Sequence, residues 1–205
     1  MLVFSDQNLA FLAVPKTGTT AIEMALKPRA DVIFSKHRKH MPAAKYRNKI
    51  LPFLDGTLGV RPAAFAVMRD PIEQIRSWFR YRSAPRLNGS AKSTNGCSFD
   101  DFVLEVIKKD HAPFAGIGSQ FSFLCSGAGT PLVDHIFAYE TQPKLIAFLE
   151  DAFNAPMNLQ QRNVSPPVKA PLSPEVEGKL RIARAQEFAL YDSIVAADGH
   201  LITPQ

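Results

Sequence analysis

Residues 14–20, with the sequence Val-Pro-Lys-Thr-Gly-Thr-Thr, constrain the fold of this chain more than any other segment. They follow the apolar run Leu9–Val14, which is typical of a buried strand, and precede Ala21–Leu26, which is typical of the start of a helix. A strand, a tight glycine-containing loop and a helix N-terminus turn several backbone N–H groups toward one point, where an anion binds. Lys16 adds a cation and three threonines add hydroxyl donors, so this loop is suited to a phosphate-like or sulfate-like group.

The loop differs from the one that binds magnesium and a nucleoside triphosphate. That loop requires Gly-x-x-x-x-Gly-Lys followed by Ser or Thr, whose hydroxyl binds the metal. Here Lys16 precedes Gly18, the only glycine of the loop, and no glycine stands before it at the required spacing. The apolar run Ala63–Met68 is followed by Arg69 instead of leading to a convincing second magnesium ligand. The sequence therefore argues against a magnesium–triphosphate site.

A second anion-binding segment is expected where the run Ala63–Met68 ends. Asp70 is suited to the N-cap of a following helix and Pro71 to its first position. In a parallel sheet the carboxyl end of this strand lies beside that of the first strand, which is where ligands bind. Arg69 can offer two parallel N–H groups to a second phosphate, and Ser77 can donate from the helix.

Together these two segments resemble the phosphate-binding motifs of sulfotransferases that use 3′-phosphoadenosine 5′-phosphosulfate (PAPS). Residues 15–20 look like the loop for the 5′-phosphosulfate, and Arg69-Asp70-Pro71 with Ser77 looks like the motif for the 3′-phosphate. The resemblance extends to the branch that includes carbohydrate sulfotransferases and compact bacterial relatives. It covers nearly the whole chain, although only the two phosphate motifs are specific. The other segments that resemble landmarks of that branch are Lys39-His40, residues 98–102, residues 134–140 and residues 163–165.

The resemblance implies roles for individual residues. The donor-binding residues would be Pro15, Lys16, Thr17, Gly18, Thr19, Thr20, Arg69 and Ser77. Lys16 would also be catalytic, because its charge would stabilise the departing 5′-phosphate oxygen, and His40 would act as general base for a hydroxyl acceptor. The candidate substrate contacts are Glu140, Asn163 and Ser165. If His40 is not the base, either Glu140 or Asp101 would be, or the acceptor would need none. No metal ligand is expected.

The function implied is transfer of a sulfuryl group from PAPS to a hydroxyl or amine acceptor by in-line displacement without a metal. The desulfated nucleotide, adenosine 3′,5′-bisphosphate (PAP), would be the product. Two alternatives stay open: a noncatalytic PAPS- or PAP-binding regulatory protein, and a P-loop kinase. The acceptor is not specified by the sequence and belongs to the sugars, lipids, peptides or small metabolites.

Composition sets further bounds on the protein. The 205 residues are expected to form one domain, residues 1–205. No secretory signal or transmembrane run is recognised, and Cys97 and Cys125 lack metal-ligand spacing, so a reducing, cytoplasmic location is expected. Residues 1–98 hold 16 Lys and Arg against 6 Asp and Glu, whereas residues 99–205 hold 8 against 13. A basic first half suits an anionic nucleotide, and no nucleic-acid-binding motif accompanies it.

Alternating strand and helix patterns predict the fold class: a single-domain, P-loop-like, three-layer α/β fold with a mostly parallel central sheet flanked by helices. The predicted strands are Leu2–Phe4, Leu9–Val14, Asp31–Phe34, Ala63–Met68 and Val133–Tyr139. The predicted helices are Thr19–Lys27, Ala43–Leu51, Pro71–Arg82, Phe99–Lys109, Thr141–Phe153 and Pro174–Ala196. Two segments, Ser83–Ser98 and Asn163–Pro174, are expected to be loops near the site.

Overall fold

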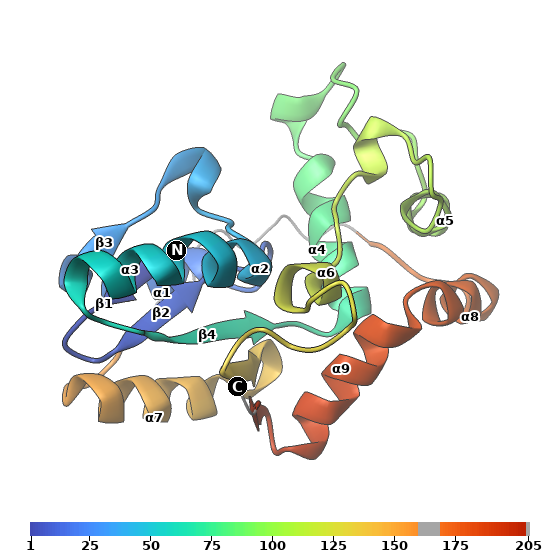
Figure 1. Cartoon of the computed structure of the whole chain (residues 1–205). Coiled ribbons are helices and arrows are strands. Elements are labelled where there is room, and N and C mark those ends of the chain that lie inside the picture. The colour runs from blue at the N-terminus through green and yellow to red at the C-terminus, as the bar shows by residue number, and fades with distance from the viewer. Residues whose placement is uncertain (160–168, 204–205) are drawn as a thin grey trace.

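The computed structural model describes residues 1–159 and 169–203. In this part of the chain, helices flank one open six-stranded sheet (Figure 1). The strands are β1 (Leu2–Phe4), β2 (Leu9–Leu12), β3 (Val32–Ile33), β4 (Ala63–Met68), β5 (His135–Ala138) and β6 (His200–Ile202). Their order across the sheet is β3-β1-β2-β4-β5-β6, so the two predicted phosphate motifs follow the neighbouring strands β2 and β4.

The prediction of a mostly parallel sheet is wrong, because the sheet is mixed. Only β2 with β4 and β4 with β5 pair in parallel among the described strands; β1 pairs antiparallel with β2 and β3, and β5 with β6. The connection between β1 and β2 is residues 5–8, in which Asn8 has a left-handed φ of +50°. So short a turn can only reverse the chain, since a parallel pairing needs a crossover of a dozen or more residues. The short strand β6 was not predicted.

The helices of the described residues are α1 (Thr19–Leu26), α2 (Ala43–Lys45), α3 (Leu51–Leu58), α4 (Pro71–Arg82), α5 (Phe99–Val106), α6 (Gln120–Leu124), α7 (Gln142–Phe153), α8 (Pro174–Ala183) and α9 (Ala185–Ala196). The bounds of β1, β4 and α4 match the predicted ones. Asp70 caps α4 as predicted, since its Oδ1 accepts a hydrogen bond of 2.9 Å from the Glu73 N–H. The predicted helix Ala43–Leu51 instead continues to Leu58, because a π-helical turn, Tyr46–Ile50, joins α2 to α3.

The predicted single helix Pro174–Ala196 is broken at Arg184, which has a non-helical φ of −116° and ψ of 27°. The Arg184 guanidinium donates to the Gly118 carbonyl at 3.2 Å and to Glu187 Oε2 at 3.0 Å. The break lets α8 pack against α5 while α9 packs against β5 and β6. The periodicity of the apolar residues could not show this break, because their spacing is helical both before and after Arg184.

Alternate residues of the strands point to opposite faces of the sheet and divide the core into two clusters. One cluster includes Leu12, Ala66 and Ile136 and packs against α2, α3, α6 and α9. The other includes Phe11, Phe65 and Phe137 and packs against α1 and α7. A third cluster joins α4, α5 and α8 beside the sheet, and Figure 1 shows α4 projecting from the end of β4 toward them.

We expect the Tyr46→Phe substitution to destabilise the fold. Tyr46 is fully buried, and its hydroxyl donates to the Pro62 carbonyl immediately before β4; burial raises the pKa of this hydroxyl, so it stays protonated. Removal of the donor leaves a buried carbonyl without this partner, which should lower the free energy of unfolding by about 1–3 kcal/mol. Chemical denaturation would measure the change. Tyr81→Phe is the control, because Tyr81 is 39% exposed, and an equal loss in both variants would contradict the argument.

Candidate active site

A cavity of about 740 Å³ lies at the carboxyl ends of the parallel strands β2, β4 and β5. Its walls come from the loop after β2, the start of α1, the end of β4 and one face of α4, with further residues from the β5–α7 connection. The lining residues include Pro15, Lys16, Thr17, Gly18, Thr19, Thr20, Lys39, His40, Arg69, Ser77, Trp78, Arg80, Tyr81, Arg86, Tyr139 and Gln142.

Most of the candidate residues from the sequence meet in this cavity. The eight donor-binding candidates and His40 all line it. Glu140 is not among the lining residues, and Asp101 belongs to the capping box of α5 with Ser98. Asn163 and Ser165 lie outside the described residues, so their predicted roles remain predictions.

The loop after β2 adopts a conformation that turns its backbone toward the cavity. Lys16 and Gly18 both have left-handed φ values, +69° and +72°, on either side of Thr17. Thr17 is buried and its Oγ1 donates to the Val14 carbonyl at 2.9 Å, while Gln74 Nε2 donates to the Pro15 carbonyl at 3.2 Å. Gly18 is the N-cap of α1 and provides no side-chain cap. The first N–H groups of α1 are therefore not capped by that side chain and can bind a ligand.

Tyr139 connects this loop to the end of β4. A Cβ atom at Gly18 would lie 2.9 Å from Tyr139 Cε2, so only glycine fits beside the ring without a shift. The Arg69 guanidinium carbon lies 4.6 Å from the centroid of the same ring, which is a cation–π distance. Sequence reasoning placed Tyr139 at the end of the predicted strand Val133–Tyr139 but assigned it no role at the site; in the structure it directly follows β5.

The Gln120 side chain forms hydrogen bonds with both the backbone N–H and the backbone carbonyl of Arg69. Its Oε1 accepts from the Arg69 N–H at 2.9 Å and its Nε2 donates to the Arg69 carbonyl at 2.8 Å. Gln120 is only 1% exposed, and its own N–H donates to Glu187 Oε1 at 2.9 Å. Sequence reasoning missed this glutamine as well. The one available signal was a polar residue at the head of the apolar run Phe121–Leu124.

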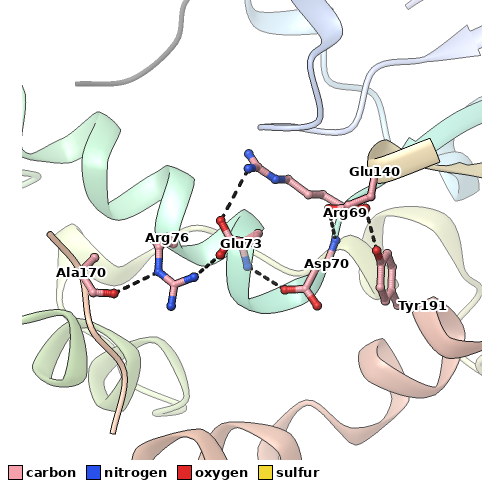
Figure 2. A network of polar contacts seen from close by, with 7 residues as sticks. All are labelled: Arg69, Asp70, Glu73, Arg76, Glu140, Ala170 and Tyr191. Atoms are coloured by element: carbon pink, nitrogen blue, oxygen red, sulfur yellow. Dashed lines mark hydrogen bonds and ion pairs between the residues drawn. The ribbon is translucent and has the colours of Figure 1, made fainter. Parts of the chain in front are cut away.

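The Arg69 side chain keeps hydrogen-bonding capacity unused. Its Nη2 lies 3.7 Å from Glu73 Oε2, and its Nε is buried without a hydrogen-bond partner. Glu73 also ion-pairs with Arg76, which donates from Nε to the Ala170 carbonyl at 3.0 Å (Figure 2). Because Glu73 is shared between two arginines, it neutralises Arg69 only in part. A half-buried guanidinium in this state is suited to a phosphate.

Glu140 ties the start of α4 to α9. Its Oε1 accepts from the Asp70 N–H at 3.1 Å and its Oε2 accepts from the Tyr191 hydroxyl at 2.6 Å, as Figure 2 shows. Burial raises the pKa of Tyr191, and the Glu140 carboxylate raises it further, so the hydroxyl remains a donor. Both carboxylate oxygens of Glu140 are thus engaged in holding the fold, and the geometry gives no direct support to its predicted contact with substrate.

Lys16 extends from the loop toward the aromatic face of α4. Its Nζ lies 4.4 Å from the ring centroid of Tyr81 and 5.6 Å from that of Trp78. Burial, together with the smaller effect of the charges of Arg69 and Arg86, lowers the pKa of Lys16 to about 8. The ammonium is charged at neutral pH, and an anion bound nearby would favour that charge.

His40 is oriented by the backbone of the loop. Its Nδ1 lies 2.7 Å from the Ala13 carbonyl oxygen, which can only accept, so Nδ1 carries the proton and Nε2 of the neutral ring is an acceptor. Burial of the ring lowers the pKa of His40 below its ordinary value, and the charge of Lys39 adds to this. Lys39 itself ion-pairs with Glu23 at 2.6 Å. The imidazole is therefore neutral at pH 7 and able to accept a proton.

The described lining of the cavity is strongly basic. Five cations line it and no Asp or Glu does; the cations are Lys16, Lys39, Arg69, Arg80 and Arg86. In residues 1–159 and 169–203, no three His, Cys, Asp or Glu side chains gather as a metal would require. This arrangement can bind an anionic ligand and present a neutral imidazole to it.

No protein-family model matches this chain, and neither does any curated protein or solved structure. None of the helices in the described residues has the length and hydropathy to cross a bilayer. The functional assignment consequently depends on the geometry of the cavity.

We expect Gly18→Ala to be more costly than an ordinary glycine substitution. A left-handed alanine costs roughly 1–2 kcal/mol, and at Gly18 the contact with Tyr139 adds to this cost. Gly59→Ala is the matched control, because Gly59 has a φ of +67° and open space where its Cβ would be. Denaturant unfolding should show a larger loss for Gly18→Ala, and Tyr139→Ala should remove the excess. Equal losses at the two glycines would show that the ring does not restrict the loop.

Proposed function

We propose that this protein is a sulfotransferase that moves a sulfuryl group from PAPS to a hydroxyl or amine acceptor. The observation that carries the proposal is one cavity, at the ends of adjacent parallel strands, in which the loop 15–20 faces Arg69 and Ser77 and no carboxylate of the described residues takes part in the lining. Two separate anion-binding elements in one cavity suit a nucleotide that carries anionic groups on both its 3′ and 5′ sides. PAPS would be the co-substrate and PAP the product.

In this proposal the two ends of the donor bind to different elements. The 5′-phosphosulfate would lie against the N–H groups of the loop and of the first turn of α1, with Lys16 beside the bridging oxygen. The 3′-phosphate would bind the Arg69 guanidinium, and Ser77 would donate to it from α4. Arg69 can make these bonds because Gln120 holds its backbone and because Glu73 pairs with it only at 3.7 Å.

The proposed reaction is an in-line displacement at sulfur. The acceptor oxygen forms a bond to sulfur as the bond from sulfur to the 5′-phosphate oxygen breaks, and the electron pair departs on that oxygen. Lys16 and the loop N–H groups stabilise the developing charge, so no metal is required for this role. The acceptor proton passes to His40 Nε2, which is free to accept it because Nδ1 is bonded to the Ala13 carbonyl.

A cytoplasmic location belongs to the same proposal. Cys97 and Cys125 are both free thiols, as is usual for a protein of a reducing compartment.

The proposal predicts that PAP binds much more tightly than adenosine 5′-monophosphate. The extra 3′-phosphate gains a charge-assisted bond to Arg69, worth roughly 1.5–3 kcal/mol, or about 10- to 150-fold in affinity. Arg69→Ala should reduce this preference to near unity, whereas Arg38→Ala, on the exposed turn Lys36–Arg38, should leave it unchanged. Calorimetric titration would measure all affinities. Equal binding of the two nucleotides to the unaltered protein would refute the sulfotransferase assignment, and PAP binding without transfer would favour a noncatalytic binding protein.

Lys16 should give the reaction an alkaline limit. Because the pKa of Lys16 is lowered to about 8, kcat/KM for PAPS should fall as the pH rises above that value and the ammonium loses its proton. Lys16→Arg should remove this fall, because a guanidinium stays charged. Lys16→Ala should lower turnover by about 10²–10³-fold and weaken PAP binding much less. Normal turnover in Lys16→Ala would remove the proposed mechanism.

His40 should give the reaction an acid limit below pH 6.5, since its pKa is lowered from the ordinary value and only the neutral ring accepts a proton. His40→Ala should retain PAP binding, lose about 10²–10⁴-fold in transfer to an alcohol and no longer show the acid limit. His37→Ala is the control, because His37 is exposed and does not line the cavity. Steady-state rates between pH 5 and 9 would test this. A nearly fully active His40→Ala protein would exclude His40 as the base.

A further inference from the structure

Arg86 is a cation at the cavity that the proposed donor site does not use. It lies in the turn Pro85–Leu87, directly after α4, inside the segment Ser83–Ser98 that the sequence predicted to be a loop near the site. Its guanidinium carbon lies 4.4 Å from the ring centroid of Tyr81. Among the described residues it forms no ion pair with a carboxylate, in contrast to Lys39 with Glu23 and Arg69 with Glu73. Its charge is therefore available to a ligand.

The position of Arg86 relative to α4 separates it from the 3′-phosphate site. Arg69 immediately precedes the N-cap of α4, and Arg86 follows the last turn. A helix of 12 residues is about 18 Å long, so the two arginines are anchored at opposite ends of it. The charges of both arginines act on Lys16, whose Nζ lies 4.4 Å from the centroid of the Tyr81 ring, the same ring that Arg86 contacts. The cavity thus extends past Lys16 toward Arg86.

The geometry of in-line transfer determines whether the donor nucleotide or the acceptor lies beside Arg86. The acceptor must approach sulfur from the side opposite the departing 5′-phosphate. If the nucleotide extends from Lys16 toward Arg69, the acceptor enters from the end of the cavity where Arg86 stands. In the proposal Lys16 is neutralised by the donor phosphosulfate, whereas Arg86 would face an acceptor without charge while no carboxylate of the described residues lines the cavity to offset it.

Resting on the proposed function, we propose that the acceptor is a small hydroxyl compound that also carries an anionic group, such as a carboxylate, and that Arg86 binds this group. The anion does not take part in the reaction. It positions the hydroxyl, whose oxygen forms the bond to sulfur and whose proton passes to His40, while the electron pair of the broken bond leaves on the 5′-phosphate of PAP. Arg86 then determines acceptor specificity and does not bind the donor.

The experiment compares matched acceptors that differ only in charge. One series is D-glucuronate, D-glucose and D-glucosamine; the other is para-hydroxyphenylacetate, para-hydroxyphenylacetamide and tyramine. Binding of each to PAP-saturated protein is followed by saturation-transfer NMR, and transfer from labelled PAPS is measured in parallel. In each series the anion should bind best and the cation worst. The saturating PAP keeps the anions out of the donor site.

Substitutions of Arg86 then test whether this residue binds the anionic group of the acceptor. Arg86→Gln should weaken binding of the anionic probes by about tenfold, the lower range for a charge-assisted bond, and leave PAP affinity nearly unchanged. Arg86→Glu should reverse the preference, so that the cationic probes bind better than the anionic ones. Lys92→Gln is the control, because Lys92 is an exposed cation of the same segment that does not line the cavity. Lys92→Gln should behave as the unaltered protein.

Three outcomes would overturn the inference. They are equal or absent binding of the anionic and neutral probes, an unchanged preference in Arg86→Glu, and a loss of PAP affinity in Arg86→Gln as large as that in Arg69→Ala. The last would assign Arg86 to the donor. In each of these cases selective PAP binding by the unaltered protein would leave the sulfotransferase proposal standing, whereas loss of that selectivity would remove both.

Discussion

The two hydrogen bonds from the Gln120 side chain to the backbone of Arg69 fix the place where β4 ends and α4 begins, and the cavity depends on that place. After Arg69 the chain can no longer pair with β5, and its N–H and carbonyl would be left without partners in a buried position. A neutral amide satisfies both at once. Since the N-cap of α4 is the next residue, Ser77, Tyr81 and the turn with Arg86 take their positions from this point.

In the absence of a ligand, the five cations that line the cavity repel one another, which is unfavourable. The surrounding structure reduces this repulsion. Aromatic rings separate the charges: Tyr81 stands between Lys16 and Arg86, and Tyr139 lies under Arg69. The carboxylates Glu23 and Glu73 offset charge from outside the lining. Burial is the main cause of the lowered pKa of Lys16, and the remaining repulsion from Arg69 and Arg86 contributes to it. A bound polyanion would remove this repulsion among the cations, and the free energy gained would contribute to the affinity for the polyanion.

The loop and the helical side of the cavity are held by different parts of the fold. Thr17 and Gln74 fix the loop after β2, and His40 is bonded to the carbonyl of Ala13 in the same stretch. The third core cluster holds α4 against α5 and α8 beside the sheet. Gln74, which belongs to α4, already joins the two sides, and Tyr139 is a further contact between them, since it meets Gly18 and Arg69 together. A ligand across the cavity would therefore touch both.

The sequence by itself determined the local elements whose signals are local: the strands β1 and β4 and the helix α4 with its Asp70 cap. Hydrophobic runs, caps and a glycine loop act over a few residues, so they can be read from the chain. Only the tertiary structure decided the mixed sheet, the break at Arg184 and the roles of Gln120 and Tyr139. Strand direction follows from how short connections close, and the partners of Gln120 lie 51 and 67 residues away. Such pairings carry no local pattern, because they arise only when distant segments are packed together.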